Sequence, residues 1–321
     1  MRIDNRKVVI VGCGFVGMSY AYAMVNQGVC DELVLIDIDK KRAEGEAMDL
    51  NHGMAFAPTH MKIKSGDYSD CKDADIVMIA AGVGQKPGES RIALLGRNAK
   101  IFESIINETL RAGFEGIFLV ATNPVDIMTN IVIKISGFPK HRVIGSGTTL
   151  DTARLRFVLG QYFGIDPRNV HAYVIGEHGD SEFVPWSQAQ LSTKSIKSVC
   201  REQPEKFSFE EVRRLGEDVK HAAYKIIEAK RATYYGIGMS LTRITKAIFG
   251  DEHSVLTVSA YLRGEYGIND VCIGIPCIIG RRGIIENLCL ELDPDEVDKL
   301  RSSCDFLADT AKQLDIGTVK A

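Results

Sequence analysis

The histidine in the stretch GEHGDSE, residues 176 to 182, has the chemistry of a proton carrier. His178 is one of only seven histidines in the chain, and imidazole is the side chain that titrates nearest to neutral pH. Acidic residues lie beside it, so it could be a catalytic acid and base, a metal ligand, or a turn residue with charged neighbours. The metal interpretation is weak, because no second histidine lies at ligand spacing.

A second pattern, Gly12-x-Gly14-x-x-Gly17, directly follows the apolar run KVVIV and opens a segment with helical character. The three glycines permit a tight turn, a close approach of the backbone to a pyrophosphate, and close packing of a helix. Asp37 ends the next apolar run, LVLID, where its carboxylate can accept hydrogen bonds from two ribose hydroxyls. The negative charge of Asp37 would repel the 2′-phosphate of NADP, so we predict NAD rather than NADP. The basic run from Lys40 to Arg42 follows closely and is the feature that speaks against this choice.

These side chains need a scaffold, and the first half of the chain alternates short apolar runs with helical patterns. The apolar runs are typical of buried parallel strands and span residues 7–12, 32–37, 75–82, 116–122 and 142–147. We therefore predict an α/β fold, with a Rossmann-type doubly wound parallel sheet in the NAD-binding residues 1–148. An α+β substrate domain is expected to follow in residues 149–321.

The second half mixes helical patterns with short strands that we expect to be antiparallel. Residues 171–179 look like a strand, and residues 271–288 look like strands joined by a glycine-rich hairpin. Ser208 with Glu211 predicts the start of a long helix as a capping box. Asp293, Pro294 and Glu296 predict the start of another, which should run to about Leu314.

Composition and charge exclude several functional classes. Hydrophobic residues make up 45% of the chain and the net charge is -3, as in ordinary globular proteins. Basic residues are interleaved with acids and apolar runs are too short to span a bilayer, so no nucleic-acid or membrane partner is predicted. The eight cysteines are scattered without metal-binding pairs, which favours reduced thiols and a cytoplasmic location.

Five stretches with reactive side chains are expected to meet where the parallel strands end, the edge at which open α/β sheets bind ligands. They are GQKPGESR (84–91), ATNPVD (121–126), LDTAR (150–154), GEHGDSE (176–182) and KRATYYGIG (230–238). In this order, behind the glycine motif, they strongly resemble the lactate/malate dehydrogenase family from about Lys7 to Leu314. The resemblance implies reversible reduction of a 2-oxo acid by NADH.

This reaction needs a hydride at the carbonyl carbon, a proton at its oxygen and a fixed carboxylate. The resemblance assigns the proton to His178 and makes Asp151, rather than the acids beside the histidine, its partner. Arg154 offers a planar, permanently charged fork for the substrate carboxylate. Arg91 would polarise the carbonyl from a segment that could close as a lid and expel water.

The remaining contacts are also implied by the resemblance. Asn123 would hydrogen-bond the substrate or the nicotinamide, and its bond to Pro124 could be cis. Thr233 would lie beside the substrate, and Ile237 would form an apolar wall for the nicotinamide. The expected cofactor contacts are Gly12, Gly14, Val16, Gly17, Asp37, Arg42, Tyr68, Gly82, Val83, Ser104, Thr122, Asn123, Ser146 and Ile237, and no metal is predicted.

Gln85 bears on the choice of substrate, because the arginine, aspartate and histidine set is shared across the family. Oxaloacetate carries a second carboxylate that needs a cation where this chain has a neutral amide, which would cost roughly several kcal/mol. We therefore predict reduction of pyruvate to (S)-lactate with regeneration of NAD+. Lys86 could supply a cation, so a malate or other 2-hydroxyacid dehydrogenase is the alternative. A non-catalytic NAD-binding protein is disfavoured by the intact reactive set.

Two further positions suggest regulation. Arg156 and His171 match the residues at which many bacterial members of the family bind fructose 1,6-bisphosphate across a subunit interface. An arginine and a protonatable histidine suit a phosphate dianion. The resemblance therefore implies an allosteric enzyme that works as a homotetramer.

Overall fold

The computed structural model describes residues 6–84, 88 and 90–313 of the 321-residue chain, and of Arg91 only the backbone. Its main feature is a mixed sheet in the order β12-β11-β10-β6-β5-β4-β1-β2-β3. Six strands run parallel, as in a Rossmann domain: β1 (Lys7–Val11), β2 (Glu32–Ile36), β3 (Lys62–Ser65), β4 (Ile76–Ile79), β5 (Ile117–Val120) and β6 (Val143–Gly145). The predicted fold class is confirmed.

Residue burial explains which strands the sequence predicted. Every residue of β1, β2, β4, β5 and β6 is buried, so these strands are continuous apolar runs. Strand β3 was not predicted, because this short edge strand buries only Ile63 and has lysines on either side.

Three antiparallel strands from the second half extend the same sheet: β10 (Ser254–Arg263), β11 (Asn269–Gly280) and β12 (Gly283–Asn287). The junction is narrow, since β10 pairs with β6 only at Ser259 and Gly145. A Cβ on Gly145 would lie 2.7 Å from that of Ser259. The following Gly147 has a φ of +51° and equally little space. Glycine at both positions therefore lets the two halves join into one sheet.

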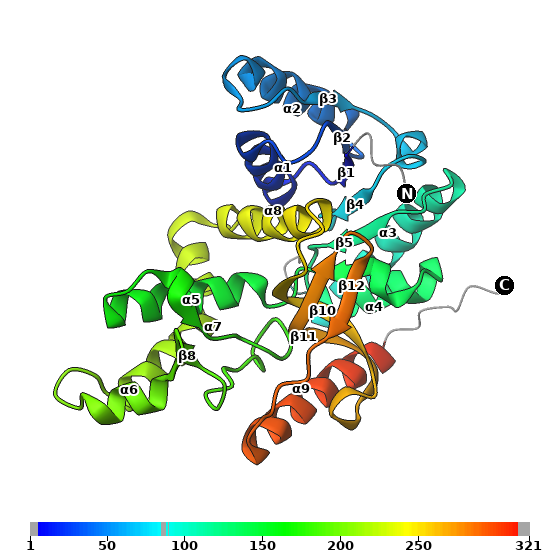
Figure 1. Cartoon of the computed structure of the whole chain (residues 1–321). Helices are drawn as coiled ribbons and strands as arrows, with labels where there is room; N and C mark the ends of the chain where they lie inside the picture. Colours follow the sequence, from blue (N-terminus) through cyan, green and yellow to red (C-terminus); the bar gives the residue numbers. More distant parts are fainter. Residues whose placement is uncertain (1–5, 85–87, 89, 314–321) are drawn as a thin grey trace.

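Helices cover the sheet and tie the halves together (Figure 1). They are α1 (Phe15–Gln27), α2 (Lys40–Gly53), α3 (Arg91–Arg111), α4 (Val125–Ser136), α8 (Tyr235–Phe249) and α9 (Pro294–Lys312). Helix α8 packs directly on α1, where a Cβ on Gly238 would lie 2.8 Å from the Ser19 backbone. The second half of the chain thus completes the hydrophobic core of the first.

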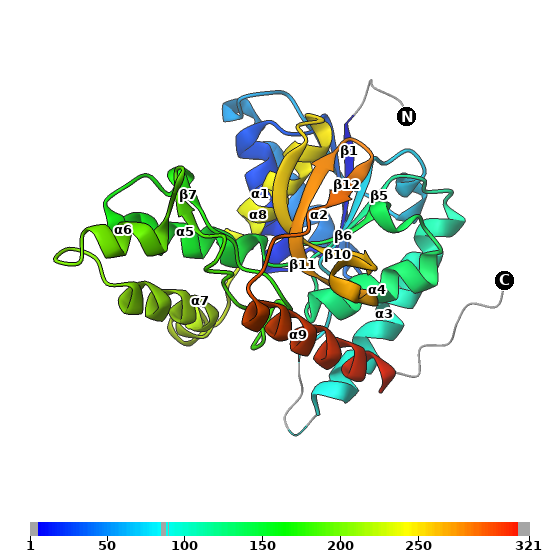
Figure 2. The same cartoon turned by 60° about the horizontal axis from the view of Figure 1, so that its bottom comes forward.

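A separate lobe projects from the sheet on one side (Figures 1 and 2). It contains α5 (Thr149–Phe163), α6 (Ile196–Glu202), α7 (Phe209–Lys230) and the short strands β7 (Val170–His171), β8 (Gln190–Leu191) and β9 (Lys194–Ser195). This lobe has its own core, which includes Leu155, Phe163 and Val212. Helix α5 begins just after β6, so it connects the sheet to the lobe.

Several local predictions need correction. The strand expected at residues 171–179 is reduced to β7 and single bridges at Ile175 and Gly176, because its parts pair separately with β8, Phe183 and β11. The hairpin in residues 271–288 is confirmed as β11 and β12. Ser208 caps α7 through the Glu211 N–H, but the Glu211 carboxylate accepts from Tyr162 rather than closing a capping box. Helix α9 is described to Lys312, so Leu314 lies outside the described residues.

Candidate active site

The glycine loop between β1 and α1 has the shape of a pyrophosphate cradle. Gly12 has a φ of +107°, and a Cβ there would lie 2.6 Å from the Ala81 backbone nitrogen. A Cβ on Gly17 would lie 2.0 Å from the Gly12 carbonyl oxygen, so both positions require glycine to fold. At Gly14, by contrast, no other described atom lies within 4 Å of a Cβ. The open side of the loop is therefore available to a ligand.

The first turn of α1 and Asp37 supply the matching polar groups. Among the described residues, no side chain caps α1 and no acid lies in its first turn, so its N–H groups can meet a phosphate. Asp37 Oδ2 accepts the Cys13 N–H at 2.7 Å, and Oδ1 accepts the Asp39 N–H at 2.9 Å. These bonds fix the carboxylate beside the glycine loop, and its free lone pairs fit two ribose hydroxyls. The residues present thus fit NAD.

Most other predicted cofactor residues follow the ends of strands β4, β5 and β6. Gly82 and Val83 are exposed after β4, and the Val83 N–H is held by Asn98 Oδ1 at 2.9 Å. Thr122 Oγ1 donates to the Ala81 carbonyl at 2.8 Å, which ties β5 to the same loop. Ser146 is buried after β6. These predicted cofactor positions therefore lie together along the carboxyl edge of the sheet.

Besides Val16 in the first turn of α1, four predicted cofactor residues come from other helical elements. Arg42 lies on α2 with Nε 3.8 Å from Glu46, and Tyr68 is partly buried in the short turn Tyr68–Cys71. Ser104 is exposed midway along α3. Ile237 lies in the first turn of α8, partly buried against the main core.

His178, Asp151 and Arg154 form a connected group. His178 Nδ1 lies 2.7 Å from Asp151 Oδ2, and Arg154 Nη1 donates to Asp151 Oδ1 at 2.8 Å. Asp151 is 2% exposed, whereas His178 and Arg154 are 24% and 14% exposed. The carboxylate therefore lies beneath two cationic side chains that remain accessible to a small ligand. The acid that contacts His178 is 27 positions away, as the resemblance implies.

Hydrogen bonds from several elements hold the segment that carries His178. Gly176 and Gly274 of β11 exchange both backbone hydrogen bonds, at 2.9 and 3.0 Å. The His178 N–H donates to Asp126 Oδ2 at 2.8 Å, and Asp126 is a buried residue of α4. On α5, Thr152 Oγ1 accepts the Val174 N–H at 2.9 Å. The imidazole is thus fixed relative to α5, which carries both Asp151 and Arg154.

The charges in this group reinforce one another. Burial lowers the pKa of His178, but the charge and hydrogen bond of Asp151, with smaller effects of Glu182 and Asp126, outweigh it and raise the pKa to about 9. Burial acts to raise the pKa of Asp151, but the charges of His178 and Arg154 lower it overall. At neutral pH the site therefore contains an imidazolium on a carboxylate.

Sequence reasoning missed the buried acid Glu182. It is 3% exposed, and its Oε2 lies 3.9 Å from His178 Nδ1. Burial and the charge of Asp151 raise its pKa to about 8. Asp151, His178 and Glu182 could together surround a metal ion, but Asp151 is already engaged by Arg154. The useful signal was the repeated acid in GEHGDSE, although spacing alone does not show which acid is buried.

The structure also separates the other acids of this stretch and adds Asp126. Glu177 is partly buried and accepts from Ser181, whereas Asp180 is exposed and accepts from Tyr224. Asp126 is buried, and burial raises its pKa to about 6. Asp126 stood in the stretch ATNPVD but drew no prediction, because an isolated acid is usually at the surface.

Of the remaining predicted substrate residues, Asn123 and Thr233 are described in full. Asn123 is exposed after β5, and its bond to Pro124 is cis. Thr233 is partly buried in the loop between α7 and α8. Arg91 begins α3, but its side chain is outside the description. Gln85 and Lys86 lie outside the described residues, so their placement stays a prediction.

Arg156 and His171 lie near one another in the separate lobe. Arg156 Nε donates to the carbonyl of Ala172 at 3.2 Å, and the guanidinium lies 5.2 Å from the Tyr173 ring centre. His171 is exposed at the end of β7. Burial lowers the pKa of Arg156.

Comparisons with known proteins agree with this geometry. Residues 6–145 match the model of the lactate/malate dehydrogenase NAD-binding domain, and residues 148–315 match that of the lactate/malate dehydrogenase alpha/beta C-terminal domain. L-lactate dehydrogenase 2 and L-lactate dehydrogenase 1 of Bacillus cereus are each 54% identical over 310 residues, covering 97% of this chain and 98% of theirs.

Solved structures of lactate dehydrogenases resemble this chain in both sequence and fold. A lactate dehydrogenase from a Medee basin deep-sea metagenome library is 54% identical with a TM-score of 0.95, over 98% of this chain and 99% of that one. The ligand-bound minor L-lactate dehydrogenase of Enterococcus mundtii is 48% identical with the same TM-score and coverage. The chain therefore belongs to the lactate/malate dehydrogenase family, and its first half is the NAD-binding domain of that family.

Proposed function

We propose that the chain is an NAD-dependent L-lactate dehydrogenase that reversibly reduces pyruvate to (S)-lactate. The observation that carries this proposal is the imidazolium of His178 on the buried carboxylate of Asp151, with Arg154 on the same carboxylate. The names of the 54% identical relatives support the choice of lactate. The neutral Gln85, which lies outside the described residues, is proposed to disfavour oxaloacetate, the substrate of the malate alternative.

The proposed roles follow from charge and position. Arg154 holds the substrate carboxylate by a two-point contact, since its Asp151 bond uses only one side of the fork. His178 gives its Nε2 proton to the carbonyl oxygen, while Asp151 at Nδ1 fixes the tautomer. NADH, when bound, supplies the hydride to the carbonyl carbon. Arg91 and Asn123 are proposed to polarise the carbonyl and orient the substrate.

Substrate preference tests this proposal. NADH oxidation is measured with pyruvate, oxaloacetate and 2-oxoisocaproate in parallel, and we expect the highest kcat/KM with pyruvate. A preference for oxaloacetate would replace lactate by malate and would contradict the Gln85 argument. His178→Gln should lose turnover by a large factor while NADH affinity is retained. Normal turnover in this variant would remove His178 from the mechanism.

We also propose that Arg156 and His171 bind fructose 1,6-bisphosphate and that the active form is a cytoplasmic homotetramer. Arg156 donates to the carbonyl of Ala172, the residue after His171, and a guanidinium with an imidazole suits a phosphate. Phe15 and Tyr22 on α1 and Tyr235 and Met239 on α8 are exposed, which supports burial of this helix pair by another subunit. No helix in the described part of the chain could cross a membrane.

Kinetic assays and sedimentation of the enzyme, each with and without fructose 1,6-bisphosphate, test this regulation. We expect the bisphosphate to lower the KM for pyruvate in the wild type and to have little effect on His171→Ala. Sedimentation should show a tetramer that the bisphosphate stabilises. Identical substrate curves with and without the bisphosphate in the wild type would refute the allosteric proposal and leave the dehydrogenase activity standing.

A further inference from the structure

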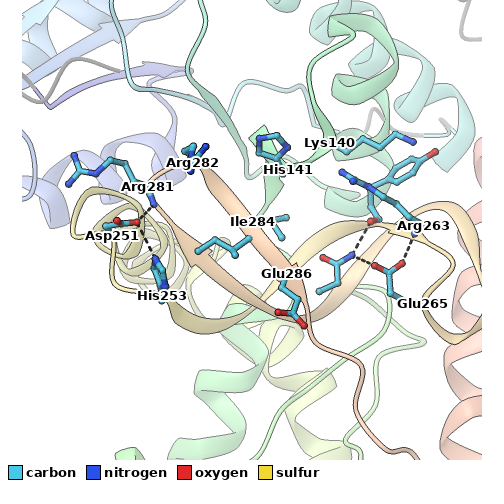
Figure 3. A pocket seen from close by; sticks show the side chains of 13 residues that line it. Lys140, His141, Asp251, His253, Arg263, Glu265, Arg281, Arg282, Ile284 and Glu286 are labelled. Carbon is cyan, nitrogen blue, oxygen red and sulfur yellow. Dashed lines mark hydrogen bonds and ion pairs between the residues drawn. The ribbon is translucent and has the colours of Figure 1, made fainter.

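A cavity of about 750 Å³ opens at the β12 edge of the main sheet, outside the site described above (Figure 3). Its walls come from the turn Lys140–Arg142, the β10 strand and the hairpin of β11 and β12. Ile284 and Ile285 provide apolar surface, while most other lining residues are charged. The size is that of a small-ligand pocket rather than of a single ion site.

Positive charge gathers on one side of this cavity. Lys140, His141, Arg263 and Arg282 all line it. Lys140 Nζ lies 3.6 Å from the Tyr261 ring centre, an orientation that leaves its charge unpaired with any acid of the described chain. Within the same described residues, the guanidinium groups of Arg263 and Arg282 form neither a hydrogen bond nor an ion pair. Two arginine forks are therefore available to an anion.

The acids that line the cavity only partly offset these cations, because most of their hydrogen bonds go to other groups. Asp251 accepts the Arg281 N–H at 2.7 Å and lies 3.5 Å from His253 Nε2. Glu265 accepts the Asn287 amide at 2.7 Å and the backbone N–H of Arg263, and its charge also interacts with that of Arg263. The Glu286 carboxylate points away from His141 and Arg282 (Figure 3). The side of the cavity at His141 is therefore left with a net positive charge.

The packing of the hairpin holds two of these groups in place. Arg281 and Arg282 form the turn between β11 and β12, and Gly283 follows with a φ of +102°. A Cβ on Gly283 would lie 2.0 Å from the His141 carbonyl oxygen, so only glycine permits this approach. His141 and Arg282 are thus fixed near one another by the backbone. Such preorganisation lowers the entropy cost of binding a ligand between them.

The cations around the cavity act on the pKa of His141. Burial lowers its pKa, and the charges of Arg142, Arg263 and Arg282 lower it further. Lys140 and Arg281 are the other cationic side chains of the cavity, His253 is its second imidazole, and Asp251, Glu265 and Glu286 are its acids. A bound dianion would reverse the repulsion and favour the imidazolium.

We propose that this cavity binds the phosphate group of a small ligand, held by Arg263, Arg282 and His141. Arginine forks match phosphate oxygens in bidentate geometry, and the imidazole adds a further donor when protonated. The phosphate group could be free inorganic phosphate or part of a sugar phosphomonoester, for which the remaining volume has room. This site is separate from Arg156 and His171 and does not depend on the proposed dehydrogenase activity.

Calorimetry with inorganic phosphate and with glucose 6-phosphate tests this site. We expect saturable binding to the wild-type enzyme with a Kd of about 1 mM or below. The double variant Arg263→Gln/Arg282→Gln should weaken binding at least about tenfold, because it removes both forks. The ligand that binds more tightly identifies the source of the phosphate group.

Three controls make the result specific. Arg301→Gln removes an exposed arginine of α9 and should bind like the wild type. His171→Ala removes the proposed effector contact and should keep the component of binding that the double variant loses. Titrations in two buffers of different ionisation enthalpy should show proton uptake that His141→Gln loses. Melting temperatures verify that each variant is folded. Three outcomes would overturn the proposal: unchanged binding by the double variant, loss of binding in His171→Ala, or no saturable heat in the wild type. The cations of the cavity would then serve only to protect the sheet edge.

Discussion

The substitution Asp151→Asn tests how the site keeps His178 protonated. It keeps the shape of the side chain but removes the charge that lies 2.7 Å from the imidazole. The rise in the His178 pKa from the ordinary 6.5 to about 9 corresponds to about 3 kcal/mol in favour of the imidazolium. With Asp151 neutral, burial acts against the charge and only Glu182 and the more distant Asp126 remain to oppose it. We expect the pKa to fall to 6.5 or lower.

The expected kinetic effect follows from the protonated fraction. At about pH 7.5 nearly all of the wild-type His178 is protonated, whereas roughly a tenth would be protonated at the ordinary pKa. The kcat/KM for pyruvate should therefore fall at least about tenfold, and further because Arg154 loses its ion pair. In wild type, pyruvate reduction should decline as pH rises through about 9, and lactate oxidation should increase over the same range.

The assay is the pH dependence of kcat/KM for pyruvate, followed by NADH absorbance at saturating NADH. Asp180→Asn is the matched control, because this acid stands two residues from His178 but is exposed and accepts from Tyr224. It should leave the profile unchanged. If Asp151→Asn retained the wild-type profile, the proton donor would have to be a group other than His178.

Four further substitutions test the surrounding structure. Glu182→Gln should have a higher melting temperature than wild type, and the difference should grow as the pH rises from 4.5 through about 8. The reason is that the wild-type fold opposes ionisation of the buried Glu182 over that range. Scanning calorimetry at the two ends of this pH range measures the difference. Arg154→Lys should raise the KM for pyruvate at least about tenfold while NADH affinity, measured by fluorescence, stays unchanged. Gly14→Val should leave the melting temperature near that of wild type but weaken NADH binding at least about tenfold, because the open side of the loop is filled. Gly17→Ala should instead destabilise the protein, since its Cβ would meet a backbone oxygen at 2.0 Å. Equal stability of the two glycine variants would contradict the assignment of Gly14 to ligand binding and of Gly17 to folding.

The sequence predicted the parallel part of the fold because burial on both faces produces continuous apolar runs. It did not predict that β10, β11 and β12 continue the same sheet. Their junction depends on one pair, Ser259 with Gly145, and on the space left by glycine. Such a fit is a property of three-dimensional packing and has no periodic pattern in the sequence.

The candidate site was predictable to a similar extent. The glycine motif and Asp37 carry their own spacing, so the cofactor site follows from local sequence. The pairing of His178 with Asp151 came only from the family resemblance, since three acids lie closer in sequence. Glu182 and Asp126 were missed because burial of a carboxylate depends on distant elements, here including α4 and β11.

Several elements meet at His178, so its pKa depends on contacts from distant parts of the chain. Its loop is hydrogen-bonded to β11 at Gly274, to α4 at Asp126 and to α9, where Ser303 Oγ accepts the Glu177 N–H at 2.8 Å. Asp151 reaches it from α5, the helix that connects the sheet to the separate lobe. Coulomb energy changes steeply at such short separations in a buried site. A small shift at any of these contacts should therefore change the His178 pKa before it changes overall stability, which makes the pH profile the most sensitive measure of the active site.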